Sequence, residues 1–399
     1  MSYFDSLQLL PEDPIFSIPR LFAADPRPNK VNLGVGNYRD AEGASYVLDC
    51  VRDAEAALLL KKSNKDYLPI DGDQKLLNLT KPLIFGQKYL DSLDGGLFIT
   101  QTLGGTGALF QGGQFLCQTI SKDIYIPDVT WPNHKQVFNN CGFDVHQYRY
   151  YDHRSHKIDF NRLCDDLSEM PQYSTILLHA CCQNPTGLDP TNDQWMELST
   201  LIKKQKIIPF FDFAYQGFKT SPEDDAFPIR YFLSQGHELL VANSFAKNFG
   251  LYGERVGTLS VLTKNKNSAP KAASLIKQRI RSNYSNPPRH GAELIAEILA
   301  SYELTKTWVT ELANMRDRLK EMRHTLQAGL QAKGDGMDWT FLKNQFGFFS
   351  FCGLNHGQVH RLIKDYAIYV PANGRINVAG LNAHNMDYVV DAILEVIHT

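Results

Sequence analysis

The residues best suited to do chemistry lie in a single run, at positions 244–257. This run places the amine of Lys247 close to the hydroxyl of Ser244 and the guanidinium of Arg255, directly after an apolar stretch at 239–242. A lysine amine can form a Schiff base with a carbonyl cofactor. A serine and an arginine can hold a phosphate on that cofactor by charge-assisted hydrogen bonds. The run therefore indicates pyridoxal phosphate (PLP). The alternative, which an isolated Ser-x-x-Lys motif favours, is a solvated lysine and arginine on a loop.

The elements that would position these groups alternate between apolar strands and helical stretches, which is typical of a parallel α/β sheet. We expect strands at 97–100, 124–126, 175–180, 207–213 and 239–242, and a helix that starts near Ala108. Ligands of an open parallel sheet bind beyond the carboxyl ends of its strands. The glycine loop at 104–107, Asn184, Asp212 with Tyr215, and Lys247 should therefore gather at one edge.

Asp212 ends a very apolar strand, where a carboxylate is costly unless it is paired. The protonated ring nitrogen of PLP would pair with it and make the ring an electron sink. A helix N-cap or an ordinary salt bridge is the alternative. The loop with Gly105 and Thr106 can bring backbone N–H groups and a hydroxyl to a phosphate at a helix N-terminus, or can be a plain tight turn. It has the spacing of neither a Walker A loop nor a dinucleotide fingerprint.

Three further residues suit a flat, charged ligand. Trp131 offers a ring for stacking, although packing in the core would explain it equally well. Arg281 and Arg375 offer guanidinium groups for bidentate carboxylate binding, so together they would bind a dicarboxylate. Either arginine alone is more typical of a surface ion pair.

Composition bounds the class of protein. The 399 residues are 43% hydrophobic and 21% charged with a net charge of -2, which is ordinary for a globular protein and lacks the basic footprint of a nucleic-acid binder. No basic region with a following apolar segment is present at the N-terminus, and no apolar stretch approaches the 18 residues of a membrane span. We expect no membrane partner and a cytoplasmic location.

Cysteine usage fits a reducing compartment. Seven cysteines are present, and their odd number and spacing match no disulfide framework. His179, Cys181 and Cys182 are close in sequence, but they lie along an apolar run whose alternate residues face opposite sides. We therefore expect no metal site there.

The chain divides into three parts. Residues 1–45 are rich in proline and glycine and predict an extended arm with little core of its own, which should join a small domain. Residues 46–314 carry the strand and helix alternation and predict a large cofactor-binding domain. Residues 315–399 continue a long helical stretch at 302–333 and then change to short strands and helices, which predicts a small α+β domain.

These runs together resemble the aspartate and aromatic aminotransferases among the fold-type I PLP enzymes. The likeness covers nearly the whole chain in the family's order, and its runs are 31–36, 67–70, 101–107, 184–187, 212–218, 244–257, 281–288 and 374–380. The resemblance implies an α/β fold in which a large domain with a mostly parallel sheet flanked by helices carries a small α+β domain.

The resemblance also implies roles around the cofactor. Lys247 matches the Schiff-base lysine and Asp212 the partner of the pyridine nitrogen, with His134 behind it. Tyr215 and Asn184 match the ligands of the phenolate oxygen, and Lys247, Asp212 and Tyr215 form the catalytic set. Trp131 matches the stacking ring. The phosphate ligands would be Gly105, Thr106, Ser244, Arg255 and, from the other subunit, Tyr67.

On the substrate side, Arg375 matches the clamp on the α-carboxylate. Arg281, contributed across a dimer, matches the clamp on a distal carboxylate, and Gly36 matches a backbone contact on the mobile small domain. Trp131 and Asn184 would contact the substrate as well as the cofactor. The resemblance thus implies a homodimer with shared active sites.

The sequence departs from the family pattern at two positions. Gln183 stands where many members have histidine, and Gly104 stands where many have serine, so one phosphate hydroxyl is missing. Gly104 and the run at 251–255 lean toward bacterial aromatic aminotransferases, whereas Arg39, Thr106 and Asn286 lean toward aspartate-preferring ones. These departures leave the choice of substrate open.

The predicted function is ping-pong transamination of L-aspartate, aromatic L-amino acids or both, with 2-oxoglutarate as acceptor. Two other classes are compatible with the fold. A PLP-dependent lyase or decarboxylase would release product without an oxo-acid acceptor. A non-catalytic binding protein would show no spectral change of its cofactor when an amino donor is added.

Overall fold

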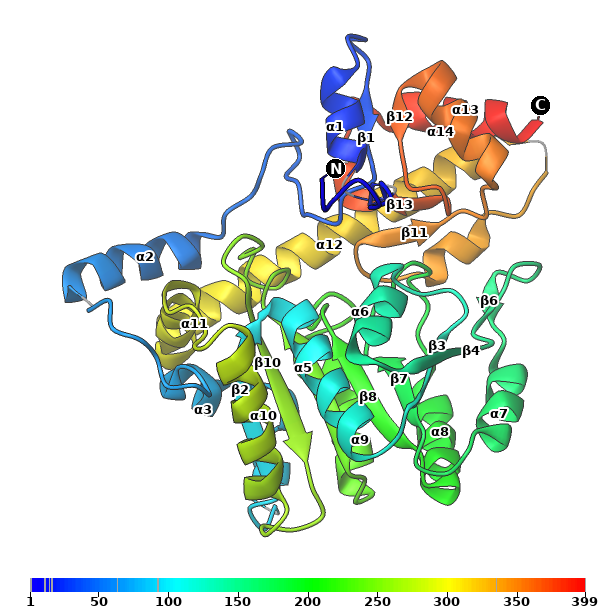
Figure 1. Cartoon of the computed structure of the whole chain (residues 1–399). Helices are drawn as coiled ribbons and strands as arrows, with labels where there is room; N and C mark the ends of the chain where they lie inside the picture. The colour runs from blue at the N-terminus through cyan, green and yellow to red at the C-terminus, as the bar shows by residue number, and fades with distance from the viewer. Residues whose placement is uncertain are drawn as a thin grey trace.

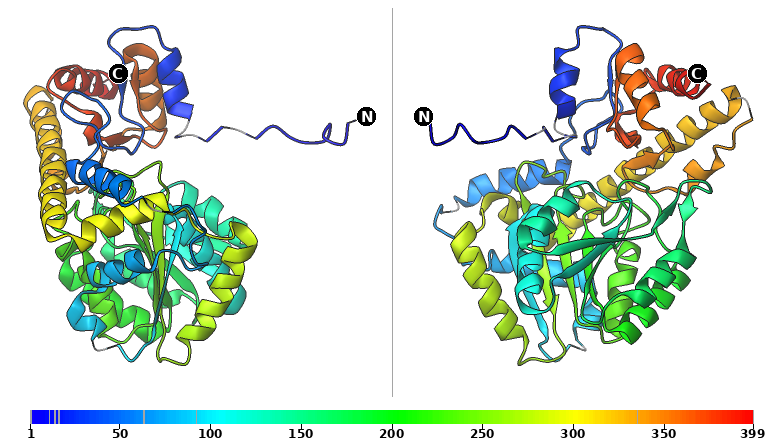
Figure 2. Two further views of the ribbon diagram at one scale, coloured as in Figure 1. Left: turned by 90° about the vertical axis from the view of Figure 1, so that its left-hand side faces the viewer. Right: turned by 45° about the vertical axis from the view of Figure 1, so that its right-hand side comes forward.

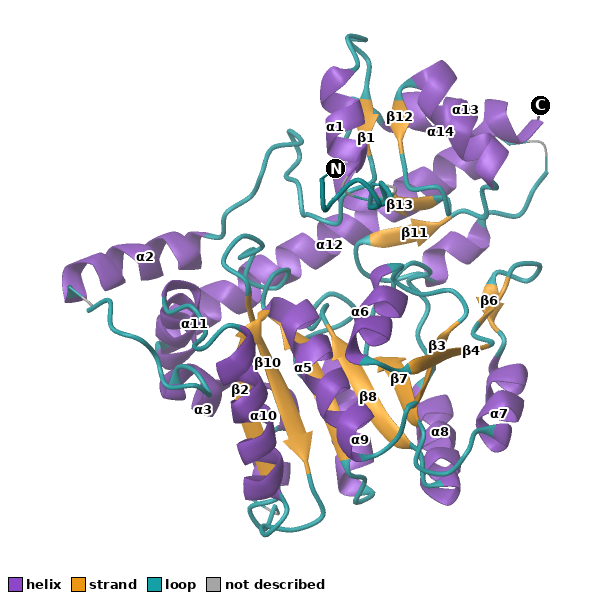
Figure 3. Ribbon diagram, in the orientation of Figure 1, coloured by secondary structure: helices purple, strands orange, loops and turns teal. Residues whose placement is uncertain are grey.

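A seven-stranded sheet forms the centre of the larger part of the molecule (Figures 1 and 3). The computed structural model describes residues 2–10, 12–13, 15, 17–62, 64–91, 93–334 and 336–398. In spatial order the strands are β2 (Leu97–Leu103), β10 (Val256–Leu262), β9 (Leu239–Ser244), β8 (Ile208–Phe213), β7 (Thr175–His179), β3 (Asp123–Pro127) and β4 (Asp144–Tyr148). Both pairings of β10 are antiparallel and the other pairings are parallel, so the predicted mostly parallel sheet is confirmed.

Helices cover both faces of this sheet because its inner strands are apolar on both sides. On one face Leu177, Phe210 and Leu240 pack with α5 (Gly104–Thr119), α6 (Asn133–Cys141) and α10 (Ala269–Asn283). On the other face Ile176 and Phe211 pack with α8 (Asn192–Gln205), α9 (Phe227–Ser234) and α11 (His290–Ala300). Neighbouring residues of a strand thus serve opposite layers, as the pleat requires.

Shorter elements complete the larger part. They are the helices α3 (Gln74–Phe85), α4 (Gln87–Leu90) and α7 (Phe160–Glu169), the hairpin of β5 (Tyr151–Asp152) with β6 (Lys157–Ile158), and a 3₁₀ turn at Asp224–Ala226. The helix α2 (Asp49–Lys61) projects to one side in Figure 1, and α12 (Tyr302–Lys333) is one continuous helix that runs from the larger part beneath the smaller one.

The smaller part combines both ends of the chain. The strand β1 (Val31–Asn32) pairs in parallel with β12 (Ile368–Tyr369), and β11 (Phe349–Phe351) pairs with β13 (Arg375–Asn377) in antiparallel fashion. The helices α13 (His356–Tyr366) and α14 (Met386–His398) pack beside them, and 3₁₀ turns lie at Thr340–Asn344 and Val378–Gly380. This pairing brings the N-terminal segment into the C-terminal layer, where the sequence led us to expect it.

The N-terminal segment contains one helix that was not predicted from the sequence. Residues 17–24 form the helix α1 (Ser17–Ala24), whose buried Ile18 packs against Tyr369. Eight residues give only two turns of apolar periodicity, and Pro19 obscures the pattern, although the first turn of a helix tolerates proline. The prediction of an extended arm without a helix is therefore wrong for residues 17–24.

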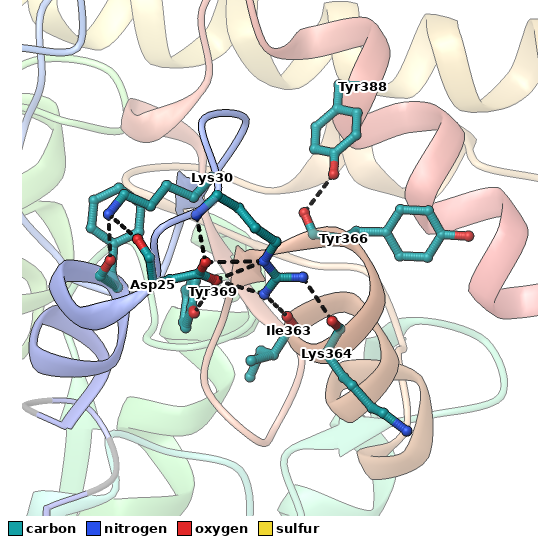
Figure 4. A network of polar contacts seen from close by, with 9 residues as sticks. Asp25, Lys30, Ile363, Lys364, Tyr366, Tyr369 and Tyr388 are labelled. Carbon is teal, nitrogen blue, oxygen red and sulfur yellow. Dashed lines mark hydrogen bonds and ion pairs between the residues drawn. The ribbon is translucent and has the colours of Figure 1, made fainter.

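A polar network ties the segment after α1 to α13 (Figure 4). Arg27 pairs with Asp25 and donates to the carbonyls of Ile363 and Lys364 at 2.9 and 2.7 Å, which lie at the end of α13. The Tyr369 hydroxyl donates to Asp25 at 2.7 Å. The hydrogen bonds from Arg27 and Tyr369 hold the pKa of Asp25 well below its usual range. The chain thus reaches β1 in a defined position.

The first residues extend away from the body of the molecule (Figure 2). Tyr3, Phe4 and Leu9 are exposed in this arm, with Leu9 fully so. In the part of the chain that the structure describes, no helix is long and apolar enough to cross a membrane.

Candidate active site

The register of the sheet brings the predicted polar residues to one edge. Asp212 pairs with His179 on one neighbouring strand and with Ala242 on the other. Ser244 lies two residues beyond Ala242, so it is close to the same edge of the sheet as Asp212. Gly257 pairs with both Ser244 and Thr102, which sets Arg255 beside the loop that follows β2. The glycine loop, Asp212, Ser244 and Lys247 therefore share the edge that the sequence predicted.

Asp212 is buried, and His134 holds its carboxylate. The His134 Nε2 atom lies 3.0 Å from Asp212 Oδ2. Burial acts to raise the pKa of Asp212, but the hydrogen bond from His134 and nearby positive charge, including that of Lys247, outweigh it, so the pKa lies below the ordinary value. The carboxylate therefore stays ionised in a place where it can charge-pair with a cationic partner.

Two residues behind His134 were not recognised in the sequence. The Thr130 hydroxyl lies 2.9 Å from His134 Nδ1 and 2.9 Å from His179 Nε2, so it joins the two rings. Burial, together with the charge of His134, lowers the pKa of His179 to about 3, which keeps this ring neutral. The available signal for His179 was its place at the end of the strand next to Asp212.

Lys247 is partly buried in the turn that follows β9. Its Nζ atom lies 5.1 Å from the centre of the Tyr215 ring. Burial, helped by the charges of Arg255 and Arg375, lowers the pKa of Lys247 to about 8 against the opposing charge of Asp212. About a tenth of the amine is consequently uncharged at pH 7, far more than for an ordinary lysine, and a nucleophile or general base requires this uncharged form. Burial also raises the pKa of the Tyr215 hydroxyl well above its usual range, so it remains a donor.

A cradle for an anion lies between the start of α5 and the end of β9. The first turn of α5 contains Gly105 and Thr106, whose N–H groups have no partner within the helix. A Cβ atom at Gly105 would lie 3.0 Å from the Ser244 Cβ, so only glycine leaves this space open. Arg255 donates to the carbonyls of Tyr252 and Leu103 at 3.1 and 3.4 Å, which fixes its guanidinium at the same place.

Gly104 explains one departure from the family pattern. It has φ +68, and a Cβ at this position would come within 2.5 Å of Arg255 Nη2. The observed placement of Arg255 therefore requires glycine here. Gln183, the other departure, accepts from the Thr186 N–H at 3.0 Å and donates to the Val129 carbonyl at 2.6 Å, so it fixes the turn that presents Asn184.

Arg375 is buried at the opposite wall, on β13. Its Nη1 donates to Asn184 Oδ1 at 3.0 Å and its Nη2 donates to the Gly34 carbonyl at 2.7 Å, and the guanidinium stacks 4.0 Å from the centre of the Phe349 ring. Its Nε atom is buried without a protein partner. Burial lowers the pKa of Arg375 to about 10, a value that still leaves it charged. A buried arginine with an unmatched N–H suits an anionic ligand.

Tyr67 and Arg281 do not join this group within the chain. Tyr67 is 89% exposed, and Arg281 is exposed near the end of α10 with Ser285 accepting from its Nη1. The two residues nevertheless belong to one surface region, because Ser285 donates to Asn286 at 2.8 Å and Asn286 donates to the Leu68 carbonyl at 2.7 Å.

Comparison with known proteins identifies the family of this chain. Residues 28–393 match the family described as aminotransferase class I and II. The chain belongs to that family. It is 43% identical over 395 residues to the aspartate aminotransferase of Escherichia coli K12, covering 99% of this chain and 100% of that one. The solved structure of the aromatic-amino-acid aminotransferase of Burkholderia pseudomallei, covalently bound to pyridoxal phosphate, superposes with a TM-score of 0.95 at 42% identity over 99% and 100% of the two chains.

A yeast relative gives the same result: the aspartate aminotransferase from Saccharomyces cerevisiae cytoplasm superposes with a TM-score of 0.96 at 38% identity, covering 99% and 98% of the two chains. The protein is an aminotransferase with pyridoxal phosphate as its cofactor, and the fold-type I architecture is confirmed. Nothing in these relationships favours a lyase or a decarboxylase.

The residues of this aminotransferase fit its cofactor. The Gly105 space, the Ser244 hydroxyl, the Arg255 guanidinium and the N-terminus of α5 form a donor set for a phosphate dianion. Trp131 lies beside the Asp212 pair, with its ring 5.2 Å from that of His134 and perpendicular to it. Lys247 lies close enough to Asp212, Arg255 and Arg375 for their charges to act on its pKa.

Proposed function

We propose that this aminotransferase transfers the amino group of L-aspartate, aromatic L-amino acids or both to 2-oxoglutarate. The observation that carries the proposal is buried Arg375, held by Asn184 and stacked on Phe349, with one N–H unmatched. An α-carboxylate would satisfy that group by a charge-assisted hydrogen bond. Curated relatives act on aspartate and solved neighbours on aromatic amino acids, which supports both donor classes.

The bound cofactor supplies an aldehyde that bonds to an amine and a protonated ring that accepts electron density from the substrate Cα. Asp212 would pair with the protonated ring nitrogen, and His134 orients that carboxylate. Tyr215 and Asn184 would donate to the phenolate oxygen; Asn184 has its Nδ2 group available for this, because its Oδ1 already accepts from Arg375. Trp131 would stack on the ring, and Gly105, Thr106, Ser244 and Arg255 would hold the phosphate.

Lys247 carries the proton in the chemical step. The Nζ atom of Lys247, when it is free, would take the proton from the substrate Cα and release it again as the transfer of the amino group is completed. A pKa of about 8 suits an amine that must accept and release a proton near neutral pH. Arg375 orients the α-carboxylate during this transfer, and Gly36 contacts the substrate from the smaller part of the molecule.

The same proposal assigns the distal carboxylate of aspartate to Arg281. Removing this guanidinium in Arg281→Ala should lower kcat/KM for aspartate by about 100-fold, because a charge-assisted pair is lost, while phenylalanine loses far less. The measurement is a donor panel of aspartate, glutamate, phenylalanine and tyrosine with 2-oxoglutarate. Lys277→Ala, one turn earlier on α10, is the matched control. Equal losses for aspartate and phenylalanine would contradict the assignment.

We further propose a homodimer in which Tyr67 and Arg281 enter the partner's site. Both are exposed in the single chain and are linked through Ser285 and Asn286. The exposed apolar side chains of the N-terminal arm, with Leu59 and Leu60 of α2 (80% and 82% exposed), also favour burial against a second copy.

The division into domains is proposed as residues 1–45 and 315–399 for the small domain and 46–314 for the large one. Met1 and Thr399 lie outside the described residues. The pairing of β1 with β12 supports joining the two ends of the chain, and the second boundary falls within α12. We also propose a cytoplasmic location, which seven free cysteines favour. Relatives include both a cytoplasmic yeast enzyme and mitochondrial enzymes, so cell fractionation is the test.

A further inference from the structure

The backbone at residues 33–40, which we call the Gly36 strap, crosses beside Arg375 without forming a helix or strand of its own beyond one isolated bridge at Arg39. It connects β1 with the segment that leads to α2 (Figure 1). Backbone carbonyls outside a ladder need other donors when water is excluded from them. The donors that serve the strap show what holds it in place.

Six carbonyls of the Gly36 strap accept hydrogen bonds from residues of two elements, and the Asp40 carbonyl also accepts from the Gly43 N–H at 3.1 Å. Arg375 and Asn377 of β13 serve the first half, and Arg318 of α12 serves the second half. The acceptors are Leu33 (2.8 Å from Asn377 N), Gly34 (2.7 Å from Arg375 Nη2), Val35 and Asn37 (2.5 and 2.9 Å from Asn377 Nδ2), and Arg39 and Asp40 (each 2.9 Å from Arg318).

Arg318 holds more than the strap. Its Nη2 also donates to the Leu381 carbonyl at 2.8 Å and its Nη1 to the Ala379 carbonyl at 3.5 Å, both just beyond β13. Its guanidinium lies 5.6 Å from the centre of the Tyr38 ring. This one side chain therefore fastens the strap and the segment after Arg375 to α12.

The strap also touches the site itself. A Cβ at Gly36 would lie 3.0 Å from Phe349 Cζ, and the Phe349 ring stacks on the Arg375 guanidinium. The Tyr38 N–H donates to the Tyr252 hydroxyl at 2.9 Å, which belongs to the Lys247 run. A shift of the strap would consequently be felt at Arg375 and at the turn that carries Lys247.

We propose that Arg318 is a positioning residue that keeps the Gly36 strap in its substrate-binding arrangement. Arg375 is shared between the strap and, in the proposed function on which this inference rests, the substrate carboxylate. Arg318 has no part in substrate binding in that proposal, so its hydrogen bonds to Arg39 and Asp40 do not compete with the substrate. Without it, only a fraction of molecules has the strap in place at any moment.

A lower competent fraction weakens apparent substrate affinity by that fraction and leaves the saturated rate nearly unchanged. Arg318→Met, which keeps an unbranched stem and loses the donors, should raise KM for both amino donors and 2-oxoglutarate by about tenfold with kcat within about twofold. Arg318→Lys retains a donor that can reach fewer carbonyls, and its KM should lie between those of the wild type and Arg318→Met.

The experiment compares the holoenzymes of the wild type, Arg318→Met, Arg318→Lys and Arg316→Met. Arg316 is the matched control, since it lies on the same helix and donates to a carbonyl, that of Thr220, away from the strap. Hydrogen–deuterium exchange of peptides spanning 33–40 is measured together with kcat and KM. Faster exchange of those peptides in Arg318→Met, a raised KM, partial rescue by lysine and wild-type behaviour of Arg316→Met would support the proposal.

Unchanged exchange at 33–40 would overturn it, as would a fall in kcat at unchanged KM or the same effects in Arg316→Met. If Arg318→Met does not accumulate as a folded protein, Arg318→Lys decides by the same two measurements. Exchange is independent of catalysis, so a wild-type enzyme without transaminase activity would count against the proposed function and not against the role of Arg318.

Discussion

At the scale of single residues, the site depends on a balance of charges around Lys247. Burial and two guanidinium groups disfavour its ammonium form, and Asp212 alone favours it. Asp212 in turn remains ionised because His134 donates to it in a buried place. The site thus contains an amine that can lose its proton next to a carboxylate that keeps its charge, which is the separation of roles that proton transfer requires.

This balance predicts a pH dependence of stability in the cofactor-free protein. The pKa of Lys247 is about 8 when folded and 10.5 in its ordinary state, so unfolding takes up a proton between these values and stability rises with pH across that window. Below pH 8 the buried ammonium costs stability. Lys247→Met should therefore stabilise the cofactor-free protein at pH 7 by about 1 kcal/mol and flatten the rise up to about pH 10.

Urea unfolding at several pH values checks this expectation. Lys219→Met is the control of opposite sign: burial acts to lower the pKa of Lys219, but the charge of Asp189 3.5 Å away outweighs it and the pKa is raised. Its loss should destabilise the protein at pH 7. A Lys247→Met variant that is less stable than the wild type at pH 7 would contradict the account.

Some residues of the site could not be predicted from the sequence. Lys247, Asp212 and Arg375 could be predicted because each lies at or near the end of an apolar strand, where an unpaired charge is energetically costly. Thr130 could not, since its significance depends on contacts with His134 and His179 that no spacing reveals, and His179 was missed although it ends the strand beside Asp212. The direction in which Asn184 presents its amide likewise follows only from its contact with Arg375.

At the scale of elements, five of the seven strands of the central sheet were predicted from their apolar runs, whereas β4, β10 and the antiparallel direction of β10 were not. The apolar runs that become β7, β8 and β9 are evident in the sequence, whereas β10 is equally apolar yet runs antiparallel to its neighbours. Hydrophobic pattern carries no direction. The helix α5 begins at Gly104, four residues before its predicted start near Ala108, because glycines hide helical periodicity while letting the backbone approach Ser244 and Arg255.

The start of α5 yields a test of the phosphate cradle. Gly104→Ser adds the hydroxyl that many family members carry, but here its Cβ meets Arg255 Nη2 and its φ is +68. We expect Arg255 to be displaced and the affinity for pyridoxal phosphate to fall by about tenfold, equivalent to about 1.4 kcal/mol. Spectroscopic titration of the cofactor-free protein measures this.

Gly253→Ser is the matched control for that variant, because it lies in the Lys247 run and a Cβ there meets no atom within 4 Å. Tighter cofactor binding by Gly104→Ser would show that the serine gains a phosphate contact instead of displacing Arg255.

At the scale of the whole molecule, the single chain leaves Tyr67 and Arg281 at the surface and the N-terminal arm extended (Figure 2). If the site is shared across a two-fold axis, two inactive variants should restore each other. Lys247→Ala inactivates its own site and Arg281→Ala inactivates the partner's site for aspartate. A heterodimer of the two therefore has one intact site out of two, and the purified heterodimer should show about half of the wild-type aspartate activity.

Co-expression of the two differently tagged variants, followed by purification through both tags, measures that recovery. Mixing the separately purified homodimers without exchange is the control. Absence of activity in the doubly tagged heterodimer would mean that Lys247 and Arg281 serve the same site within one chain.

The central claim is that Lys247 moves the proton in transamination. The most direct measurement follows ¹⁵N from labelled L-aspartate into glutamate by NMR, with 2-oxoglutarate present or omitted, for the wild type and Lys247→Ala. The account predicts stoichiometric ¹⁵N-glutamate from the wild type only when the oxo acid is present, and a rate lowered at least about a thousandfold in Lys247→Ala. Label transfer at near wild-type rate by Lys247→Ala, or release of the label without an oxo acid, would contradict it.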